Sequence, residues 1–166
     1  MTRTVRLGLI VAIVVLIVDQ LTKWWILEHV MQPPRVIEVT PFFNLVMAWN
    51  RGVSFGMFAY GADMMPYALS VLALGIVALL FNWLRKLDRT WPAVSLGMVI
   101  GGAIANVIDR LRFGAVADFL DFHATGYHWP AFNVADSGIV VGVVLLLIDG
   151  LWSRDTAVGA VDKKRG

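Results

Sequence analysis

Four long apolar segments separate the polar parts of this chain. They cover residues 7–27, 67–84, 92–111 and 133–152. Each is close to the roughly 20 residues that a helix needs to cross a bilayer core. The first follows Arg3 and Arg6 and so imitates a secretory signal peptide, but no small-residue cleavage site comes after it and the helical pattern continues through Trp24 and Trp25. We therefore expect an all-α membrane protein with four transmembrane helices, the first of which is retained.

The polar connections predict where the remaining chain lies. The long connection 28–66 contains a β-rich stretch, so we expect a small extracytoplasmic β-containing cap from about residue 36 to 58. Within it, residues 53–60 are apolar enough to lie on the bilayer surface. The polar, lysine-rich tail 154–166 is expected to be disordered and cytoplasmic. A single integral membrane domain then accounts for residues 1–166.

Composition and charge support a membrane location and set the orientation. Hydrophobic residues make up 58% of the chain and charged residues 16%, which is more apolar than soluble domains of ordinary composition. If both termini are cytoplasmic, nine of the 14 Lys and Arg residues lie on the inner side, as the positive-inside rule requires. The basic residues form no stripe for nucleic acid. The absence of cysteine excludes disulfides, thiolate nucleophiles and cysteine-bound metals.

Four aspartates fall at one predicted depth, near the outer ends of the spans. They are Asp19, Asp109, Asp118 and Asp136. Ionisable groups beside a bilayer are costly, so a functional role is the default interpretation. Two neighbouring carboxylates can share a proton, so that one activates water as a base while the other polarises a carbonyl. Such a pair could hydrolyse a peptide, but paired aspartates also occur in proton-coupled transporters.

Five sequence blocks make the pattern specific. They are Asp19-Gln20-x-x-Lys23, Asn50-x-Gly52, Gly101-Gly102 with Asn106-x-x-Asp109-Arg110, Val116-Ala117-Asp118-Phe119, and Asn133-Val134-Ala135-Asp136. Together they resemble the lipoprotein signal peptidase family, also called signal peptidase II, over nearly the whole chain. Two departures are small: Ala105 stands where glycine is usual before the asparagine, and Val116-Ala117 stands for two valines. The first bears only on how closely helices approach at that point.

The resemblance implies a function and a set of site residues. Members of this family are aspartyl endopeptidases of the bacterial inner membrane that remove the signal peptide from prolipoproteins, cutting before a cysteine that carries diacylglycerol. The matching catalytic residues are Asp118 and Asp136. Substrate-binding or site-supporting positions are Asn50, Gly52, Asn106, Asp109, Arg110, Asn133 and Ala135. The implied partners are the lipid-modified prolipoprotein and membrane lipids, with no nucleic acid, cofactor or metal. We expect a monomer with its active site at the outer face.

Several residues have plainer explanations that the sequence leaves open. Asp19 and Lys23 are four residues apart on one helix face, so we interpret them as a structural ion pair. Asp109 with Arg110 could be an ion pair or cap that fixes the third helix, and Asn106 could bind a ligand or hold the bundle. His123 and His128 invite a metal site, but no tight ligand spacing supports one. A proton-coupled transporter would instead have acidic residues across the whole bilayer and inverted halves. A passive scaffold would lose nothing beyond stability when its aspartates are changed to asparagine.

The start of the fourth helix suggests how the two catalytic aspartates divide their work. Asn133 is placed to cap this helix, and Asp136 would then lie in its first turn, where the positive end of the helix dipole favours a carboxylate. Asp118 lies in what the sequence predicts to be a connecting segment without that help. We therefore hypothesise that the shared proton resides mostly on Asp118, which leaves Asp136 as the base.

Overall fold

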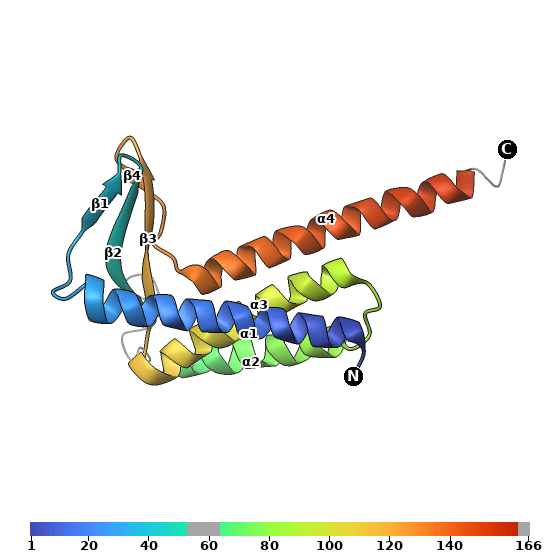
Figure 1. Ribbon diagram of the computed structural model, residues 1–166, viewed down its shortest axis with the longest axis horizontal. Helices are drawn as coiled ribbons and strands as arrows, with labels where there is room; N and C mark the ends of the chain where they lie inside the picture. Colours follow the sequence, from blue (N-terminus) through green and yellow to red (C-terminus); the bar gives the residue numbers. More distant parts are fainter. Residues whose placement is uncertain (53–63, 163–166) are drawn as a thin grey trace.

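Four helices and a small sheet make up the computed structural model, which describes residues 1–52 and 64–162, the last ten of these by their backbone only. The helices are α1 (Arg3–Trp25), which continues into a π-helical turn (Ile26–Val30), α2 (Met65–Leu84), α3 (Thr90–Phe113) and α4 (Val134–Asp162). The strands are β1 (Ile37–Thr40), β2 (Phe43–Asn50), β3 (Val116–Ala124) and β4 (Tyr127–His128). Figure 1 shows the sheet standing at one end of the helices. Helices overlap all four predicted windows.

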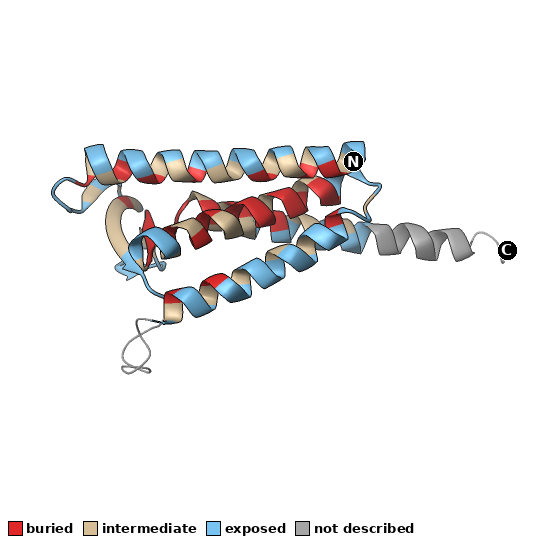
Figure 2. Cartoon of the chain, turned by 90° about the horizontal axis from the view of Figure 1, so that it is seen from below, coloured by how far each residue is buried: buried red, intermediate tan, exposed pale blue. Residues whose placement is uncertain are grey.

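Helix α3 forms the centre of the bundle and contacts the other three helices (Figure 2). Small residues on α3 let its neighbours approach closely. A methyl group at Gly101 would collide with the carbonyl oxygen of Ala12 in α1, and one at Gly102 would collide with the carbonyl oxygen of Ala135 in α4. The two glycines therefore set the distance between α3 and its neighbours, as small residues do in membrane bundles.

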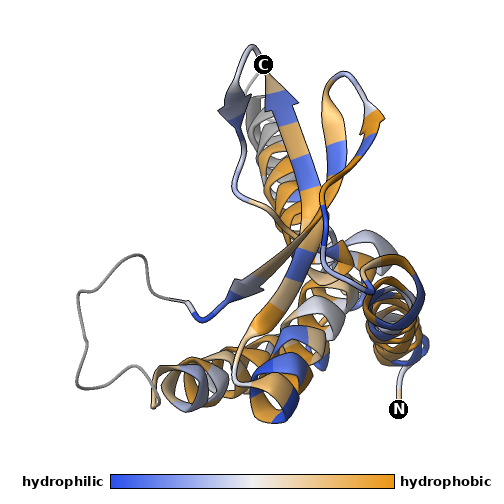
Figure 3. Ribbon diagram, turned by 90° about the vertical axis from the view of Figure 1, so that its left-hand side faces the viewer, coloured by the Kyte–Doolittle hydropathy of each residue, from blue (hydrophilic) through white to orange (hydrophobic). Residues whose placement is uncertain are grey.

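The outer helices turn apolar side chains away from the protein. All four helices are long and apolar enough to cross a membrane, but 67% of the apolar window of α3 is buried, against 11% for α2. Val71 and Leu79 on α2 and Leu147 on α4 are among the exposed residues. Such surfaces are costly in water and suited to lipid. Figure 3 shows the hydrophobic positions along the helices and the hydrophilic positions interspersed in the strands.

The cap is an antiparallel sheet in the order β1-β2-β3-β4. Its first two strands lie inside the predicted range 36–58. The end of that range, 53–58, falls outside the described residues, as does the whole of the predicted surface segment 53–60. Its other strands come from the connection after α3. Asp118 pairs with Ala48 in this sheet, so the prediction that it lies in a connecting segment was wrong. Residues 116–119 are all buried, so the sequence does not alternate there between apolar and polar residues as it does in a strand with one solvated face.

Helix α4 extends farther than predicted. It continues to Asp162, so most of the tail that we expected to be disordered is helical, and residues 163–166 lie outside the described part of the chain. Once a helix exists, each added residue gains a hydrogen bond without a new nucleation cost. Residues 153–162 contain no proline and no pair of adjacent glycines that would interrupt the helix.

Candidate active site

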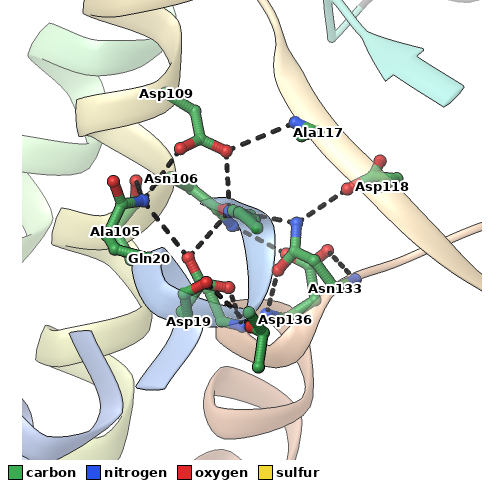
Figure 4. A network of polar contacts seen from close by, with 12 residues as sticks. Asp19, Gln20, Ala105, Asn106, Asp109, Ala117, Asp118, Asn133 and Asp136 are labelled. Atoms are coloured by element: carbon green, nitrogen blue, oxygen red, sulfur yellow. Dashed lines mark hydrogen bonds and ion pairs between the residues drawn. The ribbon is translucent and has the colours of Figure 1, made fainter. Parts of the chain in front are cut away.

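Buried polar residues from α1, α3, β3 and α4 meet at the end of the bundle where the cap stands (Figures 1 and 4). Six of them are buried, with at most 6% of their surface exposed: Asp19, Lys23, Asn106, Asp109, Asp118 and Asn133. Buried polar groups must find partners, because an unpaired one costs free energy. The hydrogen bonds and ion pairs among these residues define the geometry of the site.

A capping box begins α4. The backbone N–H of Asp136 donates to Oδ1 of Asn133 at 2.9 Å, and the backbone N–H of Asn133 donates to Oδ2 of Asp136 at 3.3 Å. This reciprocal pair satisfies N–H groups that the first turn of a helix leaves without partners. The predicted cap is therefore confirmed, and the carboxylate of Asp136 is held in the first turn, near the positive end of the helix dipole.

Asn133 also joins Asp136 to Asp118. Its amide Nδ2 donates to Oδ1 of Asp118 at 2.7 Å, while its Oδ1 accepts from the backbone of Asp136 (Figure 4). Asn106 on α3 lies beside it and donates to Oδ1 of Asp136 at 2.7 Å. The Nδ2 of Asn133 also donates to Oδ1 of Asn106 at 3.3 Å. The two aspartates thus flank a pair of hydrogen-bonded amides, one from α3 and one from the start of α4.

The electrostatic environment of Asp118 favours its protonated form. Burial, the largest influence, together with the charge of Asp136, raises the pKa of Asp118 to about 6, against the opposing effects of hydrogen bonds from Asn50 and Asn133. Asn50 ends strand β2, and its Oδ1 accepts the backbone N–H of Gly52 at 2.8 Å. Gly52 has a φ of 83°, and a side chain there would collide with Leu69. The Asn50-x-Gly52 block therefore presents the Asn50 amide to Asp118.

Lys23 is the centre of a buried ion cluster behind the amides. Its Nζ lies 2.8 Å from Oδ2 of Asp19, 2.7 Å from Oδ2 of Asp109 and 3.1 Å from Oδ1 of Asn106. The predicted ion pair between Asp19 and Lys23 is confirmed. Asp109 pairs with Lys23, and no ion pair with Arg110 is found in the described chain. One ammonium therefore stands between two carboxylates from different helices.

The same carboxylates anchor the elements that carry Asp118 and Asp136. Oδ1 of Asp19 accepts the backbone N–H of Ala135 at 2.8 Å, and Oδ2 of Asp109 accepts the backbone N–H of Ala117 at 3.3 Å. Ala135 precedes Asp136, and Ala117 precedes Asp118. Ala135 is fully buried and its backbone packs against Gly102 of α3. The ion cluster therefore positions both aspartates through the backbone.

Gln20 and Arg110 complete the surroundings. The Nε2 of Gln20 donates to Oδ1 of Asp109 at 2.9 Å, a role that the sequence analysis missed although the Asp19-Gln20 block contained the signal. The guanidinium of Arg110 donates to the backbone oxygen of Asn106 at 3.4 Å, and its charge interacts with Asp136 and Asp118. Its Nε is buried without a hydrogen-bond partner. Arg110 thus brings a positive charge toward the two aspartates.

Asp121 belongs to a separate cluster on the cap. It accepts hydrogen bonds from the Nδ2 of Asn44 at 3.1 Å and contacts the Nδ1 of His128 at 2.9 Å, and His128 stacks on His123. In the described residues, no group of three or more His, Asp or Glu side chains could hold a metal ion. Asp121 is therefore a buried carboxylate of the same strand as Asp118 with different partners.

Comparison with known proteins places the chain in a family. The model of the signal peptidase (SPase) II family matches residues 11–152. The lipoprotein signal peptidase of Rhodopseudomonas palustris (strain TIE-1) is 46% identical over 153 residues, which are 89% of this chain and 93% of the relative. That of Methylobacterium sp. (strain 4-46) is 41% identical, over 92% of this chain and 93% of the relative.

Solved structures agree with the sequence comparison. A bacterial membrane enzyme at 2.3 Å resolution is 30% identical and superposes with a TM-score of 0.75 over 90% of each chain. A second, at 1.9 Å, is 31% identical, with a TM-score of 0.75 over 87% of this chain and 92% of that one. With its four apolar helices, this chain is a multi-pass membrane protein. By the extent and identity of these matches, it belongs to the signal peptidase II family.

Proposed function

We propose that this protein removes the signal peptide from prolipoproteins by an aspartic mechanism in which Asp118 and Asp136 are the catalytic residues. Its relatives are lipoprotein signal peptidases, and the family match covers most of the chain. The observation that carries the catalytic assignment is the shared amide. Asn133 donates to Asp118 and caps the helix turn that holds Asp136, so one residue fixes the relative position of both carboxyl groups.

In this mechanism the two carboxyl groups differ in protonation. Asp136 lies in the first turn of α4 and accepts a hydrogen bond from Asn106, and we assign it the role of the base. Asp118 has its pKa raised to about 6, so it is the better holder of the shared proton. Asp136 takes a proton from water, and the resulting hydroxide attacks the scissile carbonyl, which is polarised by the Asp118 proton. Proton return to the leaving amine completes hydrolysis.

The surroundings of the pair suit this chemistry. The Lys23 cluster holds the backbone on both sides, so neither aspartate needs to move during the reaction. The positive charge of Arg110 interacts with both carboxyl groups and opposes the accumulation of negative charge at the site. We assign Asn50, Asn106 and Asn133 to the support of the two aspartates, and Asp19 and Lys23 to the structure behind them.

The position of the site at the end of the bundle suits a lipid-anchored substrate. The site lies where the spans end and the cap begins, so a peptide bond must be presented at the membrane surface. Two acyl chains on a diacylglyceryl cysteine would hold the peptide there. The start of α1 and the connection between α2 and α3 lie at the opposite end (Figure 1). These two segments contain five basic residues: Arg3, Arg6, Arg85, Lys86 and Arg89. The positive-inside rule then orients both termini to the cytoplasm of the bacterial inner membrane and the site to the outer face.

The test is cleavage of a diacylglyceryl-modified prolipoprotein by purified protein. Asp118→Asn and Asp136→Asn should each lower the rate by about 10²–10⁴-fold or more, because each removes an acid–base group. Asp121→Asn is the matched control, since it changes a buried carboxylate of the same strand outside the site, and it should stay within a few-fold of the parent. Full activity of either dyad variant would overturn the assignment. Equal cleavage of unlipidated precursor would overturn the role of the lipid.

Inhibitor binding separates the roles of the two residues. Asp118→Asn imitates the protonated acid, so it should bind a peptide-like inhibitor better than Asp136→Asn does. The measurement is an equilibrium titration of each inactive variant, with folding checked by its circular dichroism spectrum. The opposite order of affinities would reverse acid and base while leaving the pair intact.

A further inference from the structure

The start of α1 and the connection between α2 and α3 lie at the end of the bundle opposite the cap (Figure 1). A cavity lies between these two segments, far from the active site. It has a volume of about 710 Å³ and is formed by the start of α1 and the connection between α2 and α3. Its polar lining includes Arg3, Arg6 and Thr90, and its apolar lining includes Leu7 and Ile10. The hydroxyl of Thr4 in α1 donates to the backbone oxygen of Leu87 at 3.0 Å, which joins the two walls.

The cavity carries unbalanced positive charge. Arg3 and Arg6 are exposed, and neither forms an ion pair with any described residue. Both lie at the start of α1, whose first turn contains no acidic residue. Cations are unfavourable there, because the helix dipole already places positive potential at this end. Asp88 is the one acidic residue in the lining, so two guanidinium groups face a single carboxylate. The cavity therefore favours a ligand with net negative charge.

The apolar part of the cavity indicates what kind of anion fits. Ile10 follows Arg6 by about one helical turn, or roughly 6 Å along the axis, and is 51% exposed. Leu7 is half-buried between them. In a chain whose helices cross a bilayer, this order places the arginines at the level of lipid headgroups and the apolar side chains at the level of acyl chains. A free inorganic anion would use only the first of these surfaces.

We propose that this cavity binds an anionic phospholipid, with its phosphate against Arg3 and Arg6 and an acyl chain along Leu7 and Ile10. A lipid with one net negative charge, such as a phosphatidylglycerol, balances the net charge of the lining. A zwitterionic lipid brings an additional cation to a cavity that already has an excess of them. The site is independent of the proposed peptidase chemistry, because it lies at the other end of the bundle.

The test uses the purified full-length protein in detergent, where membrane orientation plays no part. Native mass spectrometry with equal amounts of phosphatidylglycerol and phosphatidylcholine, matched in their acyl chains, reports which lipid is retained. The parent should retain one phosphatidylglycerol in preference. The double variant Arg3→Gln/Arg6→Gln should bind it about thirtyfold more weakly, as expected for two basic residues near a charged headgroup.

A matched pair of variants distinguishes a site from general attraction. Arg85→Gln/Lys86→Gln removes the same charge from the same end of the bundle outside the cavity lining, and it should change phosphatidylglycerol binding less than twofold. Prolipoprotein cleavage by both double variants should equal that of the parent, which confirms their folding. Equal loss of lipid binding in both variants, or no preference in the parent, would overturn the proposal. Displacement of the lipid by millimolar inorganic phosphate would assign the cavity to free anions instead.

Discussion

Lys23 and Arg6 are basic residues near opposite ends of α1. The Lys23 side chain is 3% exposed and its Nζ contacts two carboxylates and an amide oxygen. Arg6 is exposed and forms no ion pair with any described residue. A buried charge is stabilised by its ion-pair and hydrogen-bond partners, whereas an exposed charge is stabilised mainly by the solvent. The cap end is therefore a rigid support for the site, and the opposite end is a surface that remains open to ligands.

Replacement of Lys23 should have the largest effect on stability. Lys23→Met leaves Asp19 and Asp109 buried without their cation, and breaking a buried pair in this way costs about 3–5 kcal/mol. The measurement is denaturant unfolding of the protein in detergent micelles. Arg6→Met is the control at the other end of the helix and should change the free energy of unfolding by less than about 0.5 kcal/mol.

A second substitution checks the cause. Adding Asp109→Asn to Lys23→Met removes one of the uncompensated charges, so it should restore part of the lost stability. Equal stability losses for Lys23→Met and Arg6→Met would show that burial does not distinguish the two ends. A further loss in the double variant would show that Lys23 acts by packing alone.

The pH dependence of stability should reveal the environment of Asp118. Its pKa is raised from 3.8 to about 6 in the folded protein, so the folded state binds more protons than the unfolded state between these values. The stabilisation is complete below the unfolded pKa and is lost as the pH rises through about 6, with a size of up to about 3 kcal/mol. Thermal unfolding of the parent and of Asp118→Asn from pH 4 to 7 measures this. The difference in stability between the two proteins should change with pH. A difference that stays constant from pH 4 to 7 would contradict a raised pKa of Asp118.

Asn133 should show an intermediate effect. Asn133→Ala removes the cap of α4 and the amide that donates to Asp118, which together cost about 1–2 kcal/mol of stability. Cleavage should fall more than stability does, because both proposed catalytic residues lose their common contact. Ser137→Ala is the control, since its hydroxyl donates to the backbone oxygen of Asn133 one turn earlier. A similar fall in cleavage for both variants would remove the special role of Asn133.

The smallest effect is expected for an ion pair at the end opposite the cap. Arg89 and Asp149 lie 2.6 Å apart, but the Arg89 side chain is 54% exposed. Exposed pairs contribute about 0–1 kcal/mol and are screened by salt. Arg89→Gln should therefore lower stability by less than about 1 kcal/mol at low salt and by still less at high salt. A loss as large as that of Lys23→Met would break the contrast between the two ends.

The sequence alone was sufficient for most features whose physical cause is local, although the extension of α4 to Asp162 was not predicted. Each bilayer span needs a continuous apolar stretch, so four helices could be predicted from composition and length. The Asn133-x-x-Asp136 spacing places both partners of a capping box in one turn, and the spacing of Asp19 and Lys23 places them on one helix face. These contacts form because of neighbours within four residues, and all of them are present in the structure.

Only the tertiary structure could decide what joins distant segments. Residues 116–119 at the start of β3 are all buried, so this part of the sequence lacks the alternation that identifies a strand, and Asp118 was predicted in a connection. The contact of Lys23 with Asp109, the hydrogen bond from Gln20, and the bond from Asn133 to Asp118 each depend on how α1, α3, β3 and α4 pack. The spacing of side chains in one helix shows which residues share a face. Which element packs against that face depends on the close helix contacts at Gly101 and Gly102 of α3.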